Sequence, residues 1–170
     1  MKYTTEFDEF FKKYAPEFAD WQLFKAQAIV ESNLNPDARS IVNGQPGAIG
    51  LMQIMPETGK ELGFTEEELL DPEKNIKAGC EYMKQKFYDW TPGIDDCEER
   101  LKFAFASYNA GTGNIRKAQK YAVKNGLEAQ DWSVVGLCLR KFTGDANTRQ
   151  TVNYVAKIFR IHRELQEGKC

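Results

Sequence analysis

Apolar side chains recur three or four positions apart along nearly the whole chain. In residues 20–32, Trp21, Phe24 and Ala28 fall on one face of a helix, and a second apolar stripe lies beside them. This pattern predicts a largely buried helix. Similar spacing, together with turn and capping signals, predicts further helices near residues 6–15, 72–90, 101–108, 114–125, 132–142 and 148–166.

Only residues 38–50, "ARSIVNGQPGAIG", lack a helical period, and a small hairpin fits there. The chain shows no repeat, low-complexity tract or long linker. We therefore expect a mainly α fold in a single domain that spans residues 1–170.

Composition narrows the function classes. The chain has 170 residues, 42% hydrophobic and 28% charged, with a net charge of −2, which is typical of a soluble globular protein with a real core. Nucleic acid is not an expected partner, because no basic excess is present. No apolar run approaches the roughly 20 residues of a membrane span, and no signal peptide is visible in the first residues.

The four cysteines are Cys80, Cys97, Cys138 and Cys170, and none has CxxC spacing. The one histidine, His162, is distant from them in sequence, so no zinc site, other metal or cofactor is expected, and His162 is interpreted as a surface or core-edge residue. Spacing alone leaves both disulfides and buried free thiols open.

One carboxylate interrupts the apolar pattern. Glu31 continues the face of Trp21 and Ala28 and falls in the last turn of its predicted helix. Partial burial and the negative end of the helix dipole both disfavour the ionised form, so both raise its pKa. A carboxylic acid that stays protonated near neutral pH suits general-acid catalysis, although a solvent-facing glutamate at a fraying helix end is the simpler alternative.

Four segments in order give this glutamate a context: "ES" with "NP" at 31–36, "GAIGLMQIMPETG" at 47–59, "SYNAG" at 107–111 and "RQTVNYVAKI" at 149–158. Together they resemble the catalytic domain of soluble lytic transglycosylases, relatives of goose-type lysozyme, over residues 20–165. The resemblance implies a lysozyme-like fold. It also implies cleavage of the β-1,4 bond between N-acetylmuramic acid and N-acetylglucosamine in peptidoglycan.

The resemblance implies roles residue by residue. Glu31 matches the family's single catalytic acid/base, and Tyr108 matches the tyrosine that hydrogen-bonds and orients it. The implied substrate-binding residues are Ser40, Gln53, Met55, Thr58, Tyr108, Asn109 and Tyr154. Met55 is equally compatible with core packing, and Tyr108 extends an apolar stripe, so it would be buried in either interpretation.

Two positions depart from the family pattern. The late motif has Gln150 where the family usually has glutamate, which weakens the assignment of Tyr154. The loop after Ser40 looks longer than usual, with residues 43–46 as the extra segment. Ser40 could be displaced by this loop, which would reshape one wall of the cleft.

The family mechanism needs one carboxylate. Glu31 would protonate the glycosidic oxygen and then take the proton of the sugar's C6 hydroxyl, which closes a 1,6-anhydro ring. If Asp37, Glu57 or Asp71 positioned a water instead, the protein would be a hydrolysing lysozyme. A non-catalytic glycan-binding domain is the third alternative. We expect a monomer that acts on peptidoglycan strands in the periplasm or cell envelope, or that is delivered by a phage; endo or exo action and crosslink preference stay open.

Overall fold

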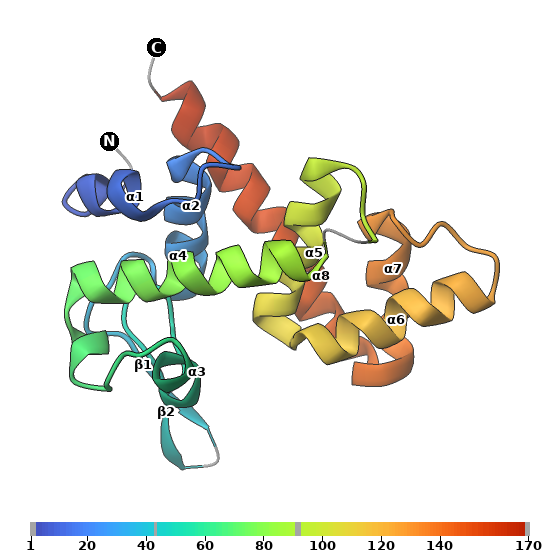
Figure 1. Ribbon diagram of the computed structural model, residues 1–170, viewed down its shortest axis with the longest axis horizontal. Coiled ribbons are helices and arrows are strands. Elements are labelled where there is room, and N and C mark those ends of the chain that lie inside the picture. Colours follow the sequence, from blue (N-terminus) through green and yellow to red (C-terminus); the bar gives the residue numbers. More distant parts are fainter. Residues whose placement is uncertain (1–2, 43, 91–92, 169–170) are drawn as a thin grey trace. The chain divides into compact units, whose positions relative to one another are not determined.

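The computed structural model describes residues 3–42, 44–90 and 93–168, which are mainly helical, as predicted (Figure 1). The elements are α1 (Asp8–Tyr14), α2 (Trp21–Ser32), β1 (Arg39–Val42), β2 (Gln45–Ile49), α3 (Pro56–Glu61), a 3₁₀ turn (Glu68–Leu70), α4 (Pro72–Asp89), α5 (Cys97–Ala110), α6 (Thr112–Lys124), α7 (Trp132–Cys138) and α8 (Arg140–Glu167). None of these helices is long and apolar enough to cross a bilayer.

The chain divides into two compact units. Unit 1 comprises residues 1–82 and 158–170, and unit 2 comprises residues 83–157. The boundaries fall inside α4 and α8. The assignment of residues 1–170 to a single domain stays a prediction.

In unit 1, α2 is the most buried helix. Asp20 caps it by accepting a hydrogen bond from the amide of Gln22, and every residue from 22 to 29 is buried. The burial extends to polar positions: Lys25 is 3% exposed and forms an ion pair with Asp8 of α1. Burying a charged lysine has a high desolvation cost unless an opposite charge lies beside it. The ion pair with Asp8 therefore holds α1 against α2.

The irregular segment contains the expected hairpin. Strands β1 and β2 are antiparallel, with Arg39 opposite Ile49 and Ile41 opposite Pro46. Two residues of β2 therefore oppose Ser40 alone, which is a β-bulge. The Ser40 hydroxyl accepts a hydrogen bond of 2.7 Å from the amide of Ala48, so the side chain fills the gap that the bulge leaves in the ladder.

Unit 2 is built around an aromatic cluster. Trp90 and Phe103 have ring centroids 5.0 Å apart, and Phe103 and Trp132 have centroids 5.6 Å apart. The indole nitrogen of Trp90 donates to the hydroxyl of Ser107 at 3.0 Å. The guanidinium of Arg116 lies 5.0 Å from the centre of the Trp90 ring, which adds a cation–π contact.

Several helix boundaries differ from the sequence prediction. The first helix begins at Asp8, later than the predicted start near residue 6, and has Phe7 at its cap position with no side-chain cap. Helix α6 begins at Thr112, two residues before the predicted start at 114, and includes Gly113. The chain re-enters a helix directly after α7, and α8 is interrupted at Gly144, where φ is 78°. The predicted break near 142–148 therefore exists but is a single-residue kink.

Three cysteines of the described residues, Cys80, Cys97 and Cys138, are free thiols; Cys170 lies outside the described residues. Burial raises the pKa of Cys80 to about 12 and also raises the pKa of Cys138. These two thiols should be inert, because the thiolate is the reactive form.

Candidate functional site

Glu31 lies in the last turn of α2 and is half-buried, as the apolar pattern predicted. The helix ends sharply after it. Asn33 has φ 56° and Leu34 has φ 59°, and the amide of Asn33 closes the helix by donating to the carbonyl oxygens of Ala28 and Ile29. Two successive non-glycine residues in the left-handed region are strained, and such strain persists only where surrounding contacts enforce it.

Ser32 connects this helix end to the second motif. Its hydroxyl contacts the carbonyl oxygen of Leu51 at 2.8 Å and that of Ala28 at 3.2 Å. A hydroxyl carries one proton, which the two carbonyls share. The residue next to Glu31 therefore holds the "GLMQIM" segment against the end of α2.

The second motif forms a tight turn, residues 49–54. Reciprocal backbone hydrogen bonds between Ile49 and Ile54, of 2.9 and 3.0 Å, close it. The amide of Gly50 donates to the carbonyl oxygen of Ala38 at 2.8 Å, which attaches the turn to the start of the hairpin. We call this segment the 49–54 turn.

Asn75 of α4 supports the 49–54 turn from beneath and is 1% exposed. Its Oδ1 accepts from the amide of Met52 at 2.8 Å. Its Nδ2 donates to the carbonyl oxygens of Ile49 and Leu69, both at 2.9 Å. One buried side chain thus pairs with the Met52 amide and the Leu69 carbonyl, and adds a second hydrogen bond to the Ile49 carbonyl, which also accepts from the Ile54 amide. Sequence reasoning missed Asn75, although a polar residue in line with the buried Gly79 and Met83 was a usable signal.

The other predicted cleft residues of unit 1 lie on or beside this turn. Gln53 has φ 48°, and its side-chain amide donates to the carbonyl oxygens of Gly50 at 2.9 Å and Ala38 at 3.3 Å. Met55 is exposed and Met52 is fully buried, so of these two methionines only Met52 packs in the core. Thr58 is half-buried in α3. Unit 1 therefore contains five of the predicted residues: Glu31, Ser40, Gln53, Met55 and Thr58.

The remaining predicted residues belong to unit 2. The "SYNAG" motif covers the end of α5, where Gly111 turns the chain into α6 with φ 82°. Tyr108 and Asn109 are half-buried, and the Oδ1 of Asn109 accepts from the hydroxyl of Thr151 at 2.9 Å. Tyr154 is buried on α8.

Asn109 also lines a small pocket of about 180 Å³ in unit 2. The pocket is lined by Asn109, Ala110, Asn114, Thr143, Asn147, Gln150 and Thr151. Apart from Ala110, its side chains carry amides and hydroxyls, which are the uncharged hydrogen-bonding groups that complement sugar hydroxyls. Gln150 thus belongs to this polar lining, together with the partner of Asn109.

The three carboxylates considered as second catalytic groups have different surroundings. Asp71 caps α4 by accepting from the amide of Lys74 at 2.9 Å, and Glu57 is an exposed residue of the first turn of α3. Asp37 is exposed in the loop after α2. Within the described residues, no group of three or more His, Cys, Asp or Glu side chains could hold a metal ion.

His162 lies at the opposite end of α2 from Glu31. Its Nε2 is 3.2 Å from the Oδ2 of Asp20. Burial alone would raise the pKa of Asp20, but hydrogen bonds from His162, Gln22 and Gln166 outweigh it, and the pKa is lowered. His162 is thus a core-edge residue with a structural partner, as expected.

Comparison with known proteins gives a family. A family model described as the transglycosylase SLT domain matches residues 9–130. The membrane-bound lytic murein transglycosylase F of Photobacterium profundum is 33% identical over 168 residues, which cover 93% of this chain and 31% of that protein. The protein of the same name from Shewanella pealeana is 35% identical over 165 residues, covering 91% of this chain and 33% of that protein. The chain spans about a third of the length of these relatives.

Solved structures share the fold. The 70 kDa soluble lytic transglycosylase of Escherichia coli superposes with a TM-score of 0.69 and 26% identity, over 96% of this chain and 25% of that one. A complex of the 70-kDa soluble lytic transglycosylase with bulgecin A is 27% identical with a TM-score of 0.69, over 95% of this chain and 24% of that one. These similarities, with the observed helices and hairpin, confirm the predicted mainly α, lysozyme-like fold.

Proposed function

Because the chain belongs to the family of transglycosylase SLT domains, as its motif order predicted, we propose that it is a lytic murein transglycosylase. It cleaves the β-1,4 bond between N-acetylmuramic acid and N-acetylglucosamine in peptidoglycan strands. Glu31 is its single acid/base, and the product ends in 1,6-anhydro-N-acetylmuramic acid. Its site of action is the periplasm or cell envelope, reached by export or by phage delivery.

The observation that carries this proposal is the setting of Glu31. The side chain is half-buried at the carboxyl end of a buried helix, where partial desolvation and the helix dipole both favour the protonated acid. The neighbouring Ser32 hydroxyl holds the 49–54 turn against that helix end. A catalytic acid needs such rigid support, because small displacements of a reacting group are costly in rate.

The proposed chemistry proceeds in two proton transfers. The Glu31 carboxylic acid gives its proton to the glycosidic oxygen as the bond to muramic acid breaks, and the substrate's N-acetyl group stabilises the positive centre. The Glu31 carboxylate then removes the proton of the C6 hydroxyl, whose oxygen bonds to C1 of the same sugar. This transfer restores the protonated form of Glu31, and no water is consumed. General acid–base catalysis contributes about 10²–10⁴-fold.

The binding roles are proposed from the family motifs. Tyr108 has the place of the tyrosine that the family motif associates with the catalytic acid, and Ser40, Gln53, Met55, Thr58, Asn109 and Tyr154 are assigned to glycan binding. The Ser40 oxygen is engaged by Ala48, but its proton can still be donated to a sugar oxygen. Replacing Tyr108 by Phe should lower kcat about tenfold and alter the acidic limb of the pH profile, whereas a purely packing role would leave that limb in place.

The test is mass spectrometry of the fragments released from purified peptidoglycan. The wild type should release fragments with 1,6-anhydro ends, and Glu31→Gln should lower the rate by about 10²–10⁴-fold. Glu61→Gln, an exposed acid on α3 of the same unit, is the matched control. Reducing ends, heavier by one water, would identify a hydrolase and direct attention to Asp37 and Glu57. No release by the wild type would overturn the proposal and leave a glycan-binding domain.

A further inference from the structure

The two units carry net charges of opposite sign. Unit 1 has 17 acidic and 11 basic residues, a net charge of −6, and unit 2 has 8 acidic and 12 basic residues, a net charge of +4. The charges are concentrated: residues 57–73 contain seven acids and one lysine, and residues 112–127 contain four basic residues and no acid. The whole chain has a net charge of only −2, so no strong repulsion keeps copies of it apart.

A groove of about 810 Å³ lies within unit 2, where α6, α7 and the start of α8 meet. We call it the unit 2 groove. Its lining includes Leu127 and Leu137, which are 45% and 64% exposed. The ring of Tyr121 also lines it. Exposed apolar side chains gathered around a groove are typical of a docking surface.

The rim of the unit 2 groove is basic. Arg140 and Lys141 belong to its lining, with Asp145 as the one acid. The amine of Lys141 lies 5.7 Å from the centre of the Tyr121 ring. Two further exposed lysines are three or four positions from Tyr121 on α6, which places them on the same helix face; they are Lys117 and Lys124. The groove therefore combines exposed leucines with an excess of positive charge.

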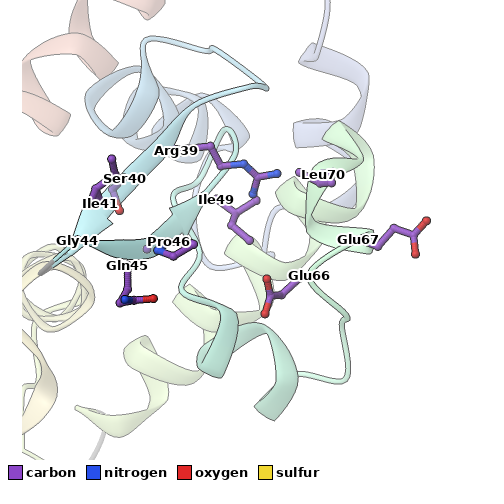
Figure 2. Close-up of a pocket in the computed structure, with 11 residues that line it drawn as sticks. Arg39, Ser40, Ile41, Gly44, Gln45, Pro46, Ile49, Glu66, Glu67 and Leu70 are labelled. Atoms are coloured by element: carbon purple, nitrogen blue, oxygen red, sulfur yellow. The ribbon is translucent and has the colours of Figure 1, made fainter.

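Unit 1 presents the opposite combination on residues 66–71, which we call the acidic edge. Leu70 is 47% exposed. Three exposed acids accompany it: Glu66, Glu67 and Asp71. Figure 2 shows the Glu67 carboxylate turned away from the hairpin, and Arg39 of the hairpin reaching toward Leu70. The edge thus offers one exposed leucine with three carboxylates and a single neighbouring guanidinium.

The unit 2 groove selects a partner that carries an apolar side chain among carboxylates. Its cations pair with acids, and contact between exposed leucines removes apolar area from water. An anionic lipid surface would attract the same cations, but it would repel unit 1 with its net charge of −6. The acidic edge of another copy of this chain supplies both the leucine and the carboxylates.

We propose that the unit 2 groove binds the acidic edge of a second copy of this chain. The contact is head-to-tail, because it joins two different surfaces, and each pair keeps one unused edge and one unused groove. Association therefore continues to longer assemblies as the concentration rises, and the expected monomer is the dilute form. Because the charges are exposed, the contact is weak and sensitive to salt. The inference goes beyond the proposed function, since neither surface includes Glu31.

The first experiment is sedimentation equilibrium of the purified chain from micromolar to near-millimolar concentration, without substrate. At about 0.01 M salt the weight-average mass should rise with concentration above that of the monomer, and at about 0.5 M salt it should return toward the monomer. A reductant is present throughout, so that the exposed thiol of Cys97 does not cross-link copies. A monomer at every concentration in low salt would overturn the inference.

The second experiment reverses the charges of each surface. One variant carries Glu66→Lys and Glu67→Lys, and the other carries Arg140→Glu and Lys141→Glu. Each alone should raise the dissociation constant at least about tenfold, because like charges then face each other. An equimolar mixture of the two should associate again, since each reversed surface meets one of opposite charge. A mixture that stays monomeric would mean that the two surfaces do not bind each other.

Matched controls separate this contact from general attraction between the units. Glu6→Lys with Glu17→Lys in unit 1, and Lys84→Glu with Lys157→Glu in unit 2, reverse the same number of exposed charges outside the two surfaces. Both controls should keep the wild-type dissociation constant to within about threefold. Losses as large as those of the surface variants would overturn the assignment.

The apolar part of the contact is tested without changing charge. Leu70→Ser and Leu137→Ser should each weaken association about tenfold, because each removes apolar area from the contact. Val123→Ser is the control, since Val123 is 65% exposed on α6 but does not line the groove. If Val123→Ser weakened association as much as Leu137→Ser, the groove would not be the binding surface.

Discussion

The two units hold their functional segments in different ways. In unit 1, the 49–54 turn is irregular backbone, and buried polar side chains satisfy it, above all Asn75. In unit 2, the "SYNAG" motif lies on regular helices, and an aromatic cluster around Phe103 packs beneath them. The conformation of the 49–54 turn is therefore held by individual hydrogen bonds, and that of the "SYNAG" segment by the volume and shape of the packed side chains.

The difference has an energetic consequence. A buried polar group that loses its partner costs about 1–3 kcal/mol, whereas an apolar core accepts swaps that conserve volume for less than about 1.5 kcal/mol. Unit 1 should therefore be intolerant of substitutions that hardly change shape, and unit 2 should be tolerant of them. Four predictions test this contrast, from the largest expected effect to the smallest.

The largest effect is expected at Asn75. Asn75→Leu keeps the approximate shape but leaves the Met52 amide and the Leu69 carbonyl without their partner and removes one of two hydrogen bonds to the Ile49 carbonyl, which should cost about 2–6 kcal/mol of unfolding free energy. The comparison variant in unit 2, Phe103→Leu, should cost about 1.5 kcal/mol. Urea denaturation followed by circular dichroism measures both, and equal losses would remove the contrast between the units.

Gly50 comes next, because it combines a positive φ with close packing. Its φ is 74°, and an added Cβ would lie 2.5 Å from the Nδ2 of Asn75. Gly50→Ala should therefore cost about 2–4 kcal/mol, from left-handed strain and from displacement of the asparagine. The double variant with Asn75→Leu should lose less than the sum, since the clash and the hydrogen bonds share one side chain. Strict additivity in thermal melts would show that the two act independently.

The helices and the hairpin were predictable because their signals are local. Apolar spacing located α2 and α4, and Asp71 with Pro72 marked the start of α4. The bulge opposite Ser40 was not predictable, since it depends on cross-strand register. A break near 142–148 was predicted, but its confinement to Gly144 was not, because the helical pattern resumes directly after this residue.

The candidate site was predictable only in part. Motif order selected Glu31 and the residues of the second motif as candidates, and the hydroxyl of Ser32, next to Glu31, is bonded to Leu51 of the 49–54 turn. The support by Asn75 could not be predicted with certainty, because its three partners are backbone groups from 6 to 26 positions away in sequence. The pocket between the β1–β2 hairpin and residues 66–70 also escaped prediction, since its walls come from segments that are distant in sequence. Periodicity reports which face is buried but not which backbone atoms are opposite it.

The third prediction compares two serines that differ in what they hold. Ser32→Ala removes the hydroxyl that contacts Leu51, and Ser107→Ala removes the acceptor of the Trp90 indole. Each should cost about 1–2 kcal/mol. Only Ser32→Ala should also lower kcat on peptidoglycan, by about tenfold, because it loosens the support of Glu31. Equal kcat losses in the two variants would indicate a general destabilisation instead.

The smallest effect tests whether polar anchoring makes unit 1 sensitive to acid. The pKa of Asp20 is lowered from 3.8, so ionised Asp20 contributes stability that is present above that value and lost as pH falls through the lowered pKa. Asp20→Asn retains a capping oxygen and should cost less than about 1 kcal/mol at pH 7, with the difference from wild type vanishing once the pH has fallen below the lowered pKa. In a His162→Gln background the cost at pH 7 should shrink, because His162 supplies one of the hydrogen bonds that lower the Asp20 pKa. Denaturation at each pH measures the difference in unfolding free energy between wild type and variant. A difference that stays constant from pH 7 to pH 2 would mean that the cap acts only through its geometry. Polar anchoring in unit 1 would then not depend on this charge.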